Sequence, residues 1–593
     1  MTFEIDEPAS KNEAELYAEI CDSLPNTCSF RALRLGGKIY VDKTELLYPI
    51  ACCRFGAYYL ARPPRFGKST LLSTLEELFE HGVEPYDDHD SCFKGLDIER
   101  LWTEPSGLYQ VLRLDFSLDF NRNKASATDF AKQLGCRIKQ FAKALNIELP
   151  QDCGTSLDPL LSALLNEVKD SSIVLLIDDF DTPLLCLAGK PEELHILQEL
   201  LRSFYALIKH FSSKFRLIFI TGLTRCKDYL TWNSGNFITD ISTYPRYAEL
   251  CGFTLAELNQ NFRLCLIYQA MHQCSTSKDY EKYISDLLNG LNLWYGGYTF
   301  GDNAYNKVLS TGSVLKFFKK AEADFPVNLS IDPGFEAVLK EKFLLSDLPS
   351  LTEHLKNNTV LRSYFSFASG ANTVEQLTLL ELLYCLGFLT LHEPVSSVSS
   401  CAAFRVANQE MMMLLSNTAA NYVMGGYQDQ PGLLNLHRDV FLDALNDSDA
   451  DAVSDCLTTV LRTINSSRKD LCSKKQISSI LYRFMSAFDL NFNLQNRSLL
   501  ATNPDLTFII NPLCSVLLIK FFVCSTNDKD KLDLRLTKAI EEIREASLPT
   551  LAIPVAKILR LALVYSVAEQ AFVRSSLLED PSPFSPAFQY LPQ

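Results

Sequence analysis

Apolar residues in this chain are concentrated in short runs and in helical patterns. Runs rich in apolar residues occur at residues 58–61, 111–117, 172–177 and 215–220, and polar residues end or follow each of them. Runs of this length, bounded by turns, are typical of strands buried in a parallel sheet. Residues 191–211 carry large apolar side chains at helical spacing. We therefore expect a strand, a crossover helix and a second parallel strand joined in the right-handed sense.

The second half of the chain has a mixed pattern. Residues 256–325 predict several helices, and residues 374–408 predict a helix followed by a β-hairpin. Residues 506–524 are almost continuously apolar, which raises the alternative of a membrane span. An Asn-Pro pair at residues 511–512 interrupts this run and Lys520 adds a charge to it. We expect two buried strands here rather than a transmembrane helix.

Composition limits the possible functions. The chain has 593 residues, of which 47% are hydrophobic, which is enough for about two to four domains. It has 56 lysines and arginines and 71 acidic residues, which gives a net charge of −15. Binding of a polyanion would therefore need a local basic patch. The 18 cysteines include no Cys-x-x-Cys pair and the N-terminus is acidic, so we expect free thiols, no zinc site and a cytoplasmic location.

The clearest chemical motif follows the first apolar run. Residues 62–69 read Arg-Pro-Pro-Arg-Phe-Gly-Lys-Ser, and a helical pattern begins just after them. This order of strand, loop and helix is typical of a phosphate-binding loop, with glycine and lysine at the phosphates and serine on Mg²⁺. The first glycine of the usual pattern is missing, because Arg62 stands there. The predicted nucleotide-binding residues are Arg62, Arg65, Phe66, Gly67, Lys68, Ser69 and Thr70.

Polar residues at the ends of two later strands complete the predicted site. Asp178 and Asp179 follow one buried strand, and we expect Asp178 to hold Mg²⁺ and Asp179 to orient the attacking water. The alternative is a core strand that ends in a solvated turn. Thr221 ends the next strand and is the candidate contact to the γ-phosphate or the water; Arg225 is either an arginine finger or the partner of a nearby acid. The predicted metal ligands are Ser69 and Asp178, and the predicted catalytic residues are Lys68, Asp179, Thr221 and Arg225.

Together these segments resemble the bacterial AAA-ATPase-like proteins that carry a C-terminal domain of the PD-(D/E)XK nuclease superfamily. The resemblance spans most of the chain and is strongest over residues 30–300. It implies a P-loop α/β fold with helices on both faces of a parallel sheet, ATP and Mg²⁺ as cofactors, and a loop that begins with Arg-Pro. The motifs that carry it lie at residues 40–44, 62–69, 93–96, 114–117, 176–184, 221–222, 251–254, 294–298 and 382–390.

The chain departs from the family pattern at both ends. Asp179 replaces the usual glutamate, which is expected to slow water positioning rather than binding, and Pro64 replaces an arginine. Such nucleases need an aspartate and, on the next strand, a Glu-x-Lys, because two acids hold Mg²⁺ and the lysine activates water. By resemblance these positions are Asp505, Lys520 and Phe522. We expect a nuclease-like fold without its metal site, with Asp505 as a strand cap and Lys520 as its candidate partner.

The resemblance and the patterns predict six segments. They are a tail or helix (1–28), a P-loop domain (29–255), a helical lid (256–325), a helical or winged-helix-like region (326–428), a degenerate nuclease-like domain (429–580) and a Pro-rich tail (581–593). The leading hypothesis is an Mg²⁺-dependent ATPase that couples nucleotide state to the C-terminal domain. The alternatives are a nucleotide-gated scaffold with little turnover, and an active nuclease with a displaced catalytic residue. A nucleic acid or protein partner at the C-terminal half and oligomerisation are both open; no membrane is expected.

Overall fold

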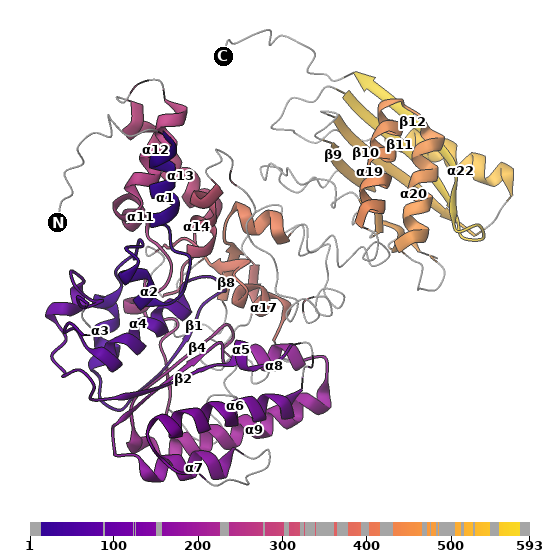
Figure 1. Ribbon diagram of the computed structural model, residues 1–593. Coiled ribbons are helices and arrows are strands. Elements are labelled where there is room, and N and C mark those ends of the chain that lie inside the picture. The colour runs from indigo at the N-terminus through magenta and orange to yellow at the C-terminus, as the bar shows by residue number, and fades with distance from the viewer. Residues whose placement is uncertain are drawn as a thin grey trace. The chain divides into compact units, whose positions relative to one another are not determined.

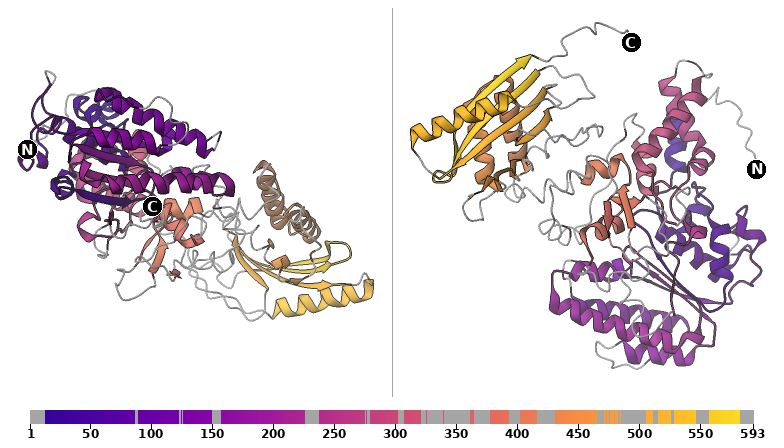
Figure 2. Two further views of the ribbon diagram at one scale, coloured as in Figure 1. Left: turned by 90° about the horizontal axis from the view of Figure 1, so that it is seen from below. Right: turned by 180° about the vertical axis from the view of Figure 1, so that it is seen from behind.

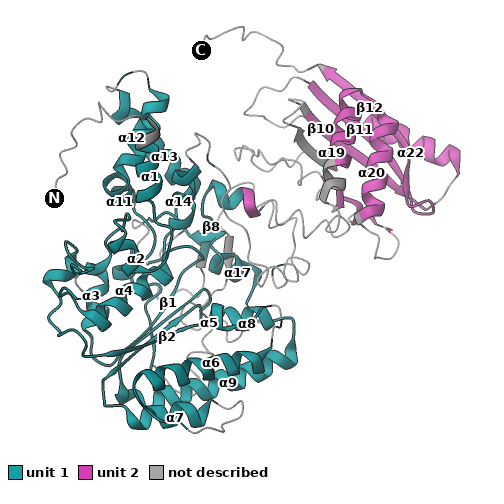
Figure 3. Ribbon diagram, viewed as in Figure 1, with its two compact units in different colours: residues 1–342, 360–412 teal, residues 343–359, 413–593 magenta. Residues whose placement is uncertain are grey.

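The computed structural model describes residues 13–581 with internal gaps. The gaps lie at 87–88, 123, 125, 150–156, 226–236, 275, 277–278, 302–306, 321–324, 326–338, 340–360, 364–376, 393–401, 416–430, 465–470, 472, 475, 479, 482–483, 485–504, 511–514, 526–527 and 546–556. The chain divides into two compact units, which Figure 3 distinguishes. The N-terminal unit comprises residues 1–342 and 360–412, and the C-terminal unit comprises 343–359 and 413–593.

Five strands form the sheet of the N-terminal unit. They are β1 (Gly56–Ala61), β2 (Gln110–Asp115), β3 (Ile173–Asp178), β4 (Phe215–Gly222) and β5 (Thr239–Asp240). Their order is β2-β3-β4-β1-β5, and the neighbouring strands pair in parallel. The four apolar runs of the first half of the chain all belong to this sheet. The predicted α/β class with a parallel sheet is therefore confirmed.

Helices lie on both faces of this sheet (Figure 1). They are α2 (Phe30–Leu35), α3 (Thr44–Cys52), α4 (Lys68–His81), α5 (Phe116–Asp119), α6 (Ala127–Ala144), α7 (Asp158–Glu167), α8 (Thr182–Leu187) and α9 (Pro191–His210), with 3₁₀ turns at Asp97–Arg100, Ser212–Lys214 and Pro245–Tyr247. Helix α4 packs against β2 and β3, while α6, α7 and α9 pack against one another. The predicted crossover helix is α9, which runs between β3 and β4 and buries Leu197, Leu201 and Phe204.

A helical group follows the sheet in the sequence. It consists of α11 (Leu255–Asn261), α12 (Arg263–Gln273), α13 (Tyr280–Tyr295) and α14 (Thr311–Lys320), and the N-terminal helix α1 (Glu13–Ser23) joins it. These five helices share one apolar core that includes Leu16, Leu266, Leu291 and Phe317. The helical pattern expected over residues 256–325 is thus present.

A small antiparallel sheet completes the N-terminal unit. Its elements are β6 (Leu361–Ser363), α17 (Leu379–Cys385), β7 (Leu389–Leu391) and β8 (Ala402–Val406), with strand order β6-β8-β7. The helix and hairpin predicted for residues 374–408 are therefore confirmed. The tip of that hairpin and much of the region expected at 326–428 lie outside the described residues.

The C-terminal unit is a four-stranded sheet with helices on both faces, which the left view of Figure 2 shows along the sheet. Its elements are α19 (Pro431–Asn446), α20 (Ala450–Ile464), β9 (Leu506–Ile510), β10 (Ser515–Cys524), α22 (Lys529–Arg544), β11 (Lys557–Ser566) and β12 (Ala571–Pro581). Alternate residues of β10 face opposite sides: Leu517 joins the core of α19 and α20, whereas Val516 joins that of α22. The apolar run at residues 506–524 forms β9 and β10, as predicted, and no described helix is long and apolar enough to cross a membrane.

Candidate functional site

The parallel register brings the C-terminal ends of three strands to one edge of the N-terminal sheet. Ala61 of β1 pairs with Gly222 of β4, and Ile177 of β3 pairs with Ile220 of β4. Strand β4 therefore lies between the strand that leads into the Gly-Lys-Ser loop and the strand that ends in acids. Thr221, near the tip of β4, is placed between these two sets of residues.

The loop between β1 and α4 has a strained backbone that distant segments hold in place. Gly67 caps α4 with φ of 90°, and a Cβ added there would meet no atom within 4 Å. Arg65 also has positive φ, 64°. Its carbonyl oxygen accepts a hydrogen bond of 3.0 Å from the Gly312 amide of α14, and that of Phe66 accepts one of 3.1 Å from the Gly252 amide. The loop is thus fixed by residues about 190 to 250 positions later, which satisfy two of its carbonyl oxygens.

A cavity of about 370 Å³ opens at this loop. Five predicted nucleotide-binding residues line it, namely Arg65, Gly67, Lys68, Ser69 and Thr70. The other side is formed by residues from three separate elements, which are Asp179, Thr182 and Thr311. Backbone N–H groups at the start of α4, a lysine and a hydroxyl therefore meet at one cavity. This donor set suits an anion with several oxygens, such as a polyphosphate.

Lys68 is only 6% exposed. Its Nζ donates hydrogen bonds to the carbonyl oxygens of Arg62, at 3.1 Å, and Pro63, at 3.2 Å. The Asp179 Oδ1 atom lies 3.7 Å from the same nitrogen. The ammonium group is therefore held at the inner side of the loop, between loop carbonyls and a carboxylate.

Asp179 begins the turn after β3 with φ of 47°, an uncommon value for an aspartate. Its side chain is 28% exposed and lines the cavity. Burial raises the pKa of Asp179 to about 6, against the opposite effect of the Lys68 ammonium. A carboxylate that faces a cavity with such a pKa is suited to accept a proton near neutral pH.

Asp178 is 1% exposed and shares a hydrogen bond with the neighbouring strand. The Thr221 hydroxyl donates to its Oδ1 at 2.6 Å, and the Asp179 amide donates to the Thr221 hydroxyl oxygen at 3.4 Å. The other carboxylate oxygen, Oδ2, is buried and accepts no hydrogen bond. Thr221 therefore contacts Asp178, and the second oxygen of Asp178 carries no hydrogen bond.

Two residues of the predicted binding set do not line this cavity. The Arg62 guanidinium is buried and donates to the carbonyl oxygens of Ala61, Ser242 and Tyr247, each at 2.8 Å. The Phe66 ring packs edge-on against Tyr298 and Phe300. Neither residue lines this cavity, whereas Phe66 does line the second, smaller cavity described below.

Arg225 pairs with an acid, which is one of the two alternatives open from the sequence. Its Nε and Nη2 atoms lie 2.7 and 2.6 Å from Asp240 Oδ2, on the edge strand β5. This ion pair links the end of β4 to β5.

Sequence reasoning missed a third carboxylate, Asp181, which is completely buried. It accepts hydrogen bonds from the Leu223 amide, at 2.9 Å, and from the Thr224 hydroxyl, at 2.8 Å. It thereby ties the turn after β3 to the end of β4. The repeated acids at residues 178–181 were the available signal, but the sequence did not indicate which of them would face inward.

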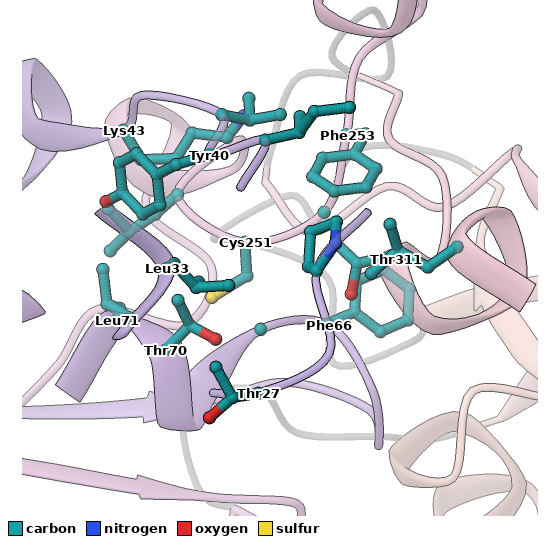
Figure 4. Close-up of a pocket in the computed structure, with 17 residues that line it drawn as sticks. Thr27, Leu33, Tyr40, Lys43, Phe66, Thr70, Leu71, Cys251, Phe253 and Thr311 are labelled. Atoms are coloured by element: carbon teal, nitrogen blue, oxygen red, sulfur yellow. The ribbon is translucent and has the colours of Figure 1, made fainter. Parts of the chain in front are cut away.

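A second, smaller cavity of about 130 Å³ lies beside the first, and Figure 4 shows the residues that line it. Both cavities are lined by Gly67, Thr70 and Thr311. The walls of the second are mostly apolar and come from residues 39–43, from α4, from residues 250–253 and from α14. Lys43 lines it, and its Nζ pairs with Glu257 of α11. The two cavities together therefore offer a polar part and an apolar part around one loop.

Comparison with known proteins gives two matches. The chain is 28% identical over 297 residues to a protein of Azotobacter chroococcum mcd 1 described as "Uncharacterized protein in vnfD 5'region". The match covers 50% of this chain and 51% of that protein, so the chain spans about half the length of the curated relative it matches. Residues 26–229, which include the loop, β3 and β4, match the family described as "Predicted AAA-ATPase", so this segment is similar to AAA-ATPase-like domains.

Proposed function

We propose that the N-terminal unit binds ATP with Mg²⁺ and hydrolyses it. The observation that carries this proposal is the meeting of Lys68, Ser69 and Asp179 around one cavity at the carboxyl edge of a parallel sheet. Ligands of open α/β sheets bind at this edge. The AAA-ATPase-like match over residues 26–229 supports a nucleotide as the ligand.

In this proposal the phosphates bind at the N-terminus of α4. Gly67 caps α4 without a side-chain hydrogen bond, so the first amides of the helix lack an intrahelical acceptor, and the helix dipole favours negative charge there. The Lys68 ammonium contributes the positive charge. It exchanges its contacts with the Arg62 and Pro63 carbonyls, which are neutral acceptors, for phosphate oxygens, which are charged ones. The apolar walls of the second cavity are suited to the nucleotide base.

The residues present fit a magnesium ion. The buried Oδ2 of Asp178 accepts no hydrogen bond, and the Ser69 side chain belongs to the cavity wall at the start of α4. Oxygen ligands of this kind, completed by phosphates and water, are those that Mg²⁺ takes in nucleotide sites. We propose Ser69, which lines the cavity, and Asp178, which is buried beside Thr221, as the residues that hold it. When bound, the ion neutralises charge on the phosphates.

For hydrolysis we propose that Asp179 orients a water and accepts its proton. Its carboxylate lines the phosphate cavity, and its pKa of about 6 leaves it ionised at neutral pH. Thr221 is proposed to fix the Asp178 carboxylate through their hydrogen bond of 2.6 Å. Arg225 is held by Asp240, and we propose that it supports β5 and the end of β4.

The test is binding and turnover by the full chain. Wild type is expected to bind a fluorescent ATP analogue and to release phosphate; Lys68→Ala is expected to lose both, and Asp179→Asn to keep binding and lose turnover. Lys214→Ala is the matched control, because Lys214 also bonds a backbone carbonyl, that of Val168, away from the cavity. Absence of nucleotide binding by the wild type would refute the proposal.

One observation favours a second candidate, a nucleotide-gated binding protein with little turnover. The Asp179 side chain is shorter than the glutamate usual at this position, and its carboxylate lies 3.7 Å from the Lys68 ammonium. An ion pair with Lys68 therefore competes with the use of Asp179 as a base. Phosphate release by the wild type at the level of Lys68→Ala, together with tight ATP binding, would favour this candidate.

For the C-terminal unit we propose a nuclease-like fold that has lost its metal site and serves as a docking surface. The Lys520 Nζ atom lies 2.7 Å from Glu542 and 3.8 Å from Asp505, and Lys474 lies 2.7 Å from Asp505. Ammonium groups thus stand where a cation would bind, which supports the loss. DNA cleavage that Asp505→Ala abolishes would contradict the proposed loss of the metal site.

We also propose that α11–α14 form a lid over the nucleotide and that the domain boundaries predicted from the sequence hold.

A further inference from the structure

Arg113 connects three parts of the nucleotide site, although it lies on a strand that carries none of the predicted residues. It belongs to β2, two residues before the strand ends. Its Nη1 donates to Glu76 Oε2 of α4 at 2.7 Å, and its Nη2 donates to the Ser69 carbonyl oxygen at 3.4 Å. The same Nη2 lies 3.8 Å from Asp178 Oδ2 of β3. One guanidinium therefore contacts α4, the end of the phosphate loop and the acid-bearing strand.

The contact with Asp178 involves the carboxylate oxygen that is otherwise unsatisfied. Oδ1 accepts the Thr221 hydroxyl, whereas Oδ2 is buried and accepts no hydrogen bond. A buried carboxylate charge is costly unless a cation compensates it. Among the described residues, Arg113 is the one that forms an ion pair with Asp178. At 3.8 Å the guanidinium compensates the charge without occupying Oδ2 through a hydrogen bond.

Glu76 fixes the guanidinium in this position. The Glu76–Arg113 bond of 2.7 Å is shorter than the other two contacts, so the carboxylate on α4 holds the side chain back from Asp178. The planar fork of arginine allows one group to contact Glu76 with Nη1 while Nη2 faces Ser69 and Asp178. A lysine ammonium has the same charge but only one nitrogen.

We infer that Arg113, held by Glu76, is a positioning residue that keeps Asp178 and the main chain of Ser69 at the separation that a divalent cation needs. This inference rests on the proposed function, because it assigns Arg113 to the metal part of that same site. Arg113 is not among the residues that line the phosphate cavity. Its loss should therefore weaken the metal-dependent part of nucleotide binding more than the metal-independent part.

The test separates these two parts in the full chain. A fluorescent ATP analogue is titrated in excess EDTA, and MgCl₂ is then titrated into the complex. Arg113→Gln is expected to raise the Mg²⁺ concentration that gives half of the fluorescence change about tenfold. This is the lower end of the range for residues that orient metal ligands. Its affinity for the analogue in EDTA is expected to stay within about twofold of wild type. Arg113→Lys is expected to restore part of the Mg²⁺ response, and Glu76→Gln to show a smaller loss in the same direction.

The control is Arg137→Gln, which removes another arginine–carboxylate pair, the one with Asp119 at 2.9 Å in the same unit. It is expected to leave both titrations unchanged. If the melting curve shows that Arg113→Gln does not fold, the Mg²⁺ titrations of Arg113→Lys and Glu76→Gln test the inference instead. An Mg²⁺ requirement that is unchanged or lowered in variants that bind the analogue overturns the inference. A wild type that binds no analogue in EDTA or in Mg²⁺ refutes the proposed function instead.

Discussion

The Thr221 hydroxyl donates a hydrogen bond of 2.6 Å to Asp178 Oδ1, across the pair formed by β4 and β3. Because one hydroxyl has one proton to donate, this bond defines what Thr221 does in the described state: it orients the buried acid. The residue near the tip of β4 is thus joined to the proposed metal ligand.

Replacing Thr221 by valine keeps the shape of the side chain and removes that bond. Both Asp178 oxygens would then lack a hydrogen bond, because Oδ2 already accepts none. We expect a loss of about 2 kcal/mol in the free energy of unfolding, measured by urea titration, together with slower ATP turnover. Thr221→Ser retains the hydroxyl and should behave nearly as wild type. Equal stabilities of the valine and serine variants would contradict the role given to this bond.

Asp181→Asn tests the buried carboxylate that ties the two strand ends together. An amide nitrogen would face the donors of Leu223 and Thr224, which now both bond the carboxylate. We expect a loss of about 2 to 3 kcal/mol of stability, seen as a lower urea midpoint. Asp170→Asn is the control, because the Asp170 side chain is largely exposed and pairs with Lys214 at the surface. A variant as stable as this control would show that the buried contacts are dispensable.

The pKa of Asp179 predicts how activity and stability depend on pH. Burial raises this pKa from 3.8 to about 6, so the ionised carboxylate prevails above that value. Turnover is expected to fall as the pH drops through about 6, in initial-rate measurements at saturating ATP. Stability depends on pH with the opposite sign. The folded protein binds this proton more tightly than the unfolded chain does, so the contribution of Asp179 to the free energy of unfolding decreases as the pH rises from about 4 to about 6. Asp179→Asn should lack both dependences, and a wild-type rate that is flat through this range would contradict the assignment.

Gly67→Ala places a Cβ on a residue with φ of 90° at the start of α4. No atom lies within 4 Å of that Cβ, so the cost is backbone strain rather than a clash. We expect about 1 to 2 kcal/mol of strain and a loss of ATP-analogue binding, because the loop would relax away from its phosphate-binding form. Gly189→Ala is the matched control, since its Cβ would also meet nothing and its φ is not positive. Binding by Gly67→Ala at the wild-type level would show that the loop tolerates a side chain there.

Much of the fold could be predicted because it depends on local patterns. The run at residues 173–177 is apolar throughout and belongs to β3, since a strand buried on both faces needs no polar position. The Gly-Lys-Ser segment predicted a loop before a helix, and α4 begins at Lys68. The run at residues 506–524 divides into β9 and β10 on either side of its Asn-Pro pair.

The direction of particular side chains could not be predicted in this way. Arg62 was expected to bind nucleotide, but its guanidinium bonds the carbonyl oxygens of Ser242 and Tyr247, which are 180 or more positions away. Arg113 gave no signal beyond a charge inside a strand, and its partners lie on α4 and β3. Such contacts depend on which segments the folded chain brings together.

The sequence by itself determined the strands, the phosphate-type loop and the acids at the end of β3, because periodicity and turn chemistry are local properties of the chain. Tertiary structure alone decided that β4 separates the loop from Asp178, that α14 fixes Arg65, and that Asp181 faces inward while Asp179 faces the cavity. The physical reason is that a hydrogen-bond or ion-pair partner is chosen by packing between distant segments, and that choice is absent from any local pattern.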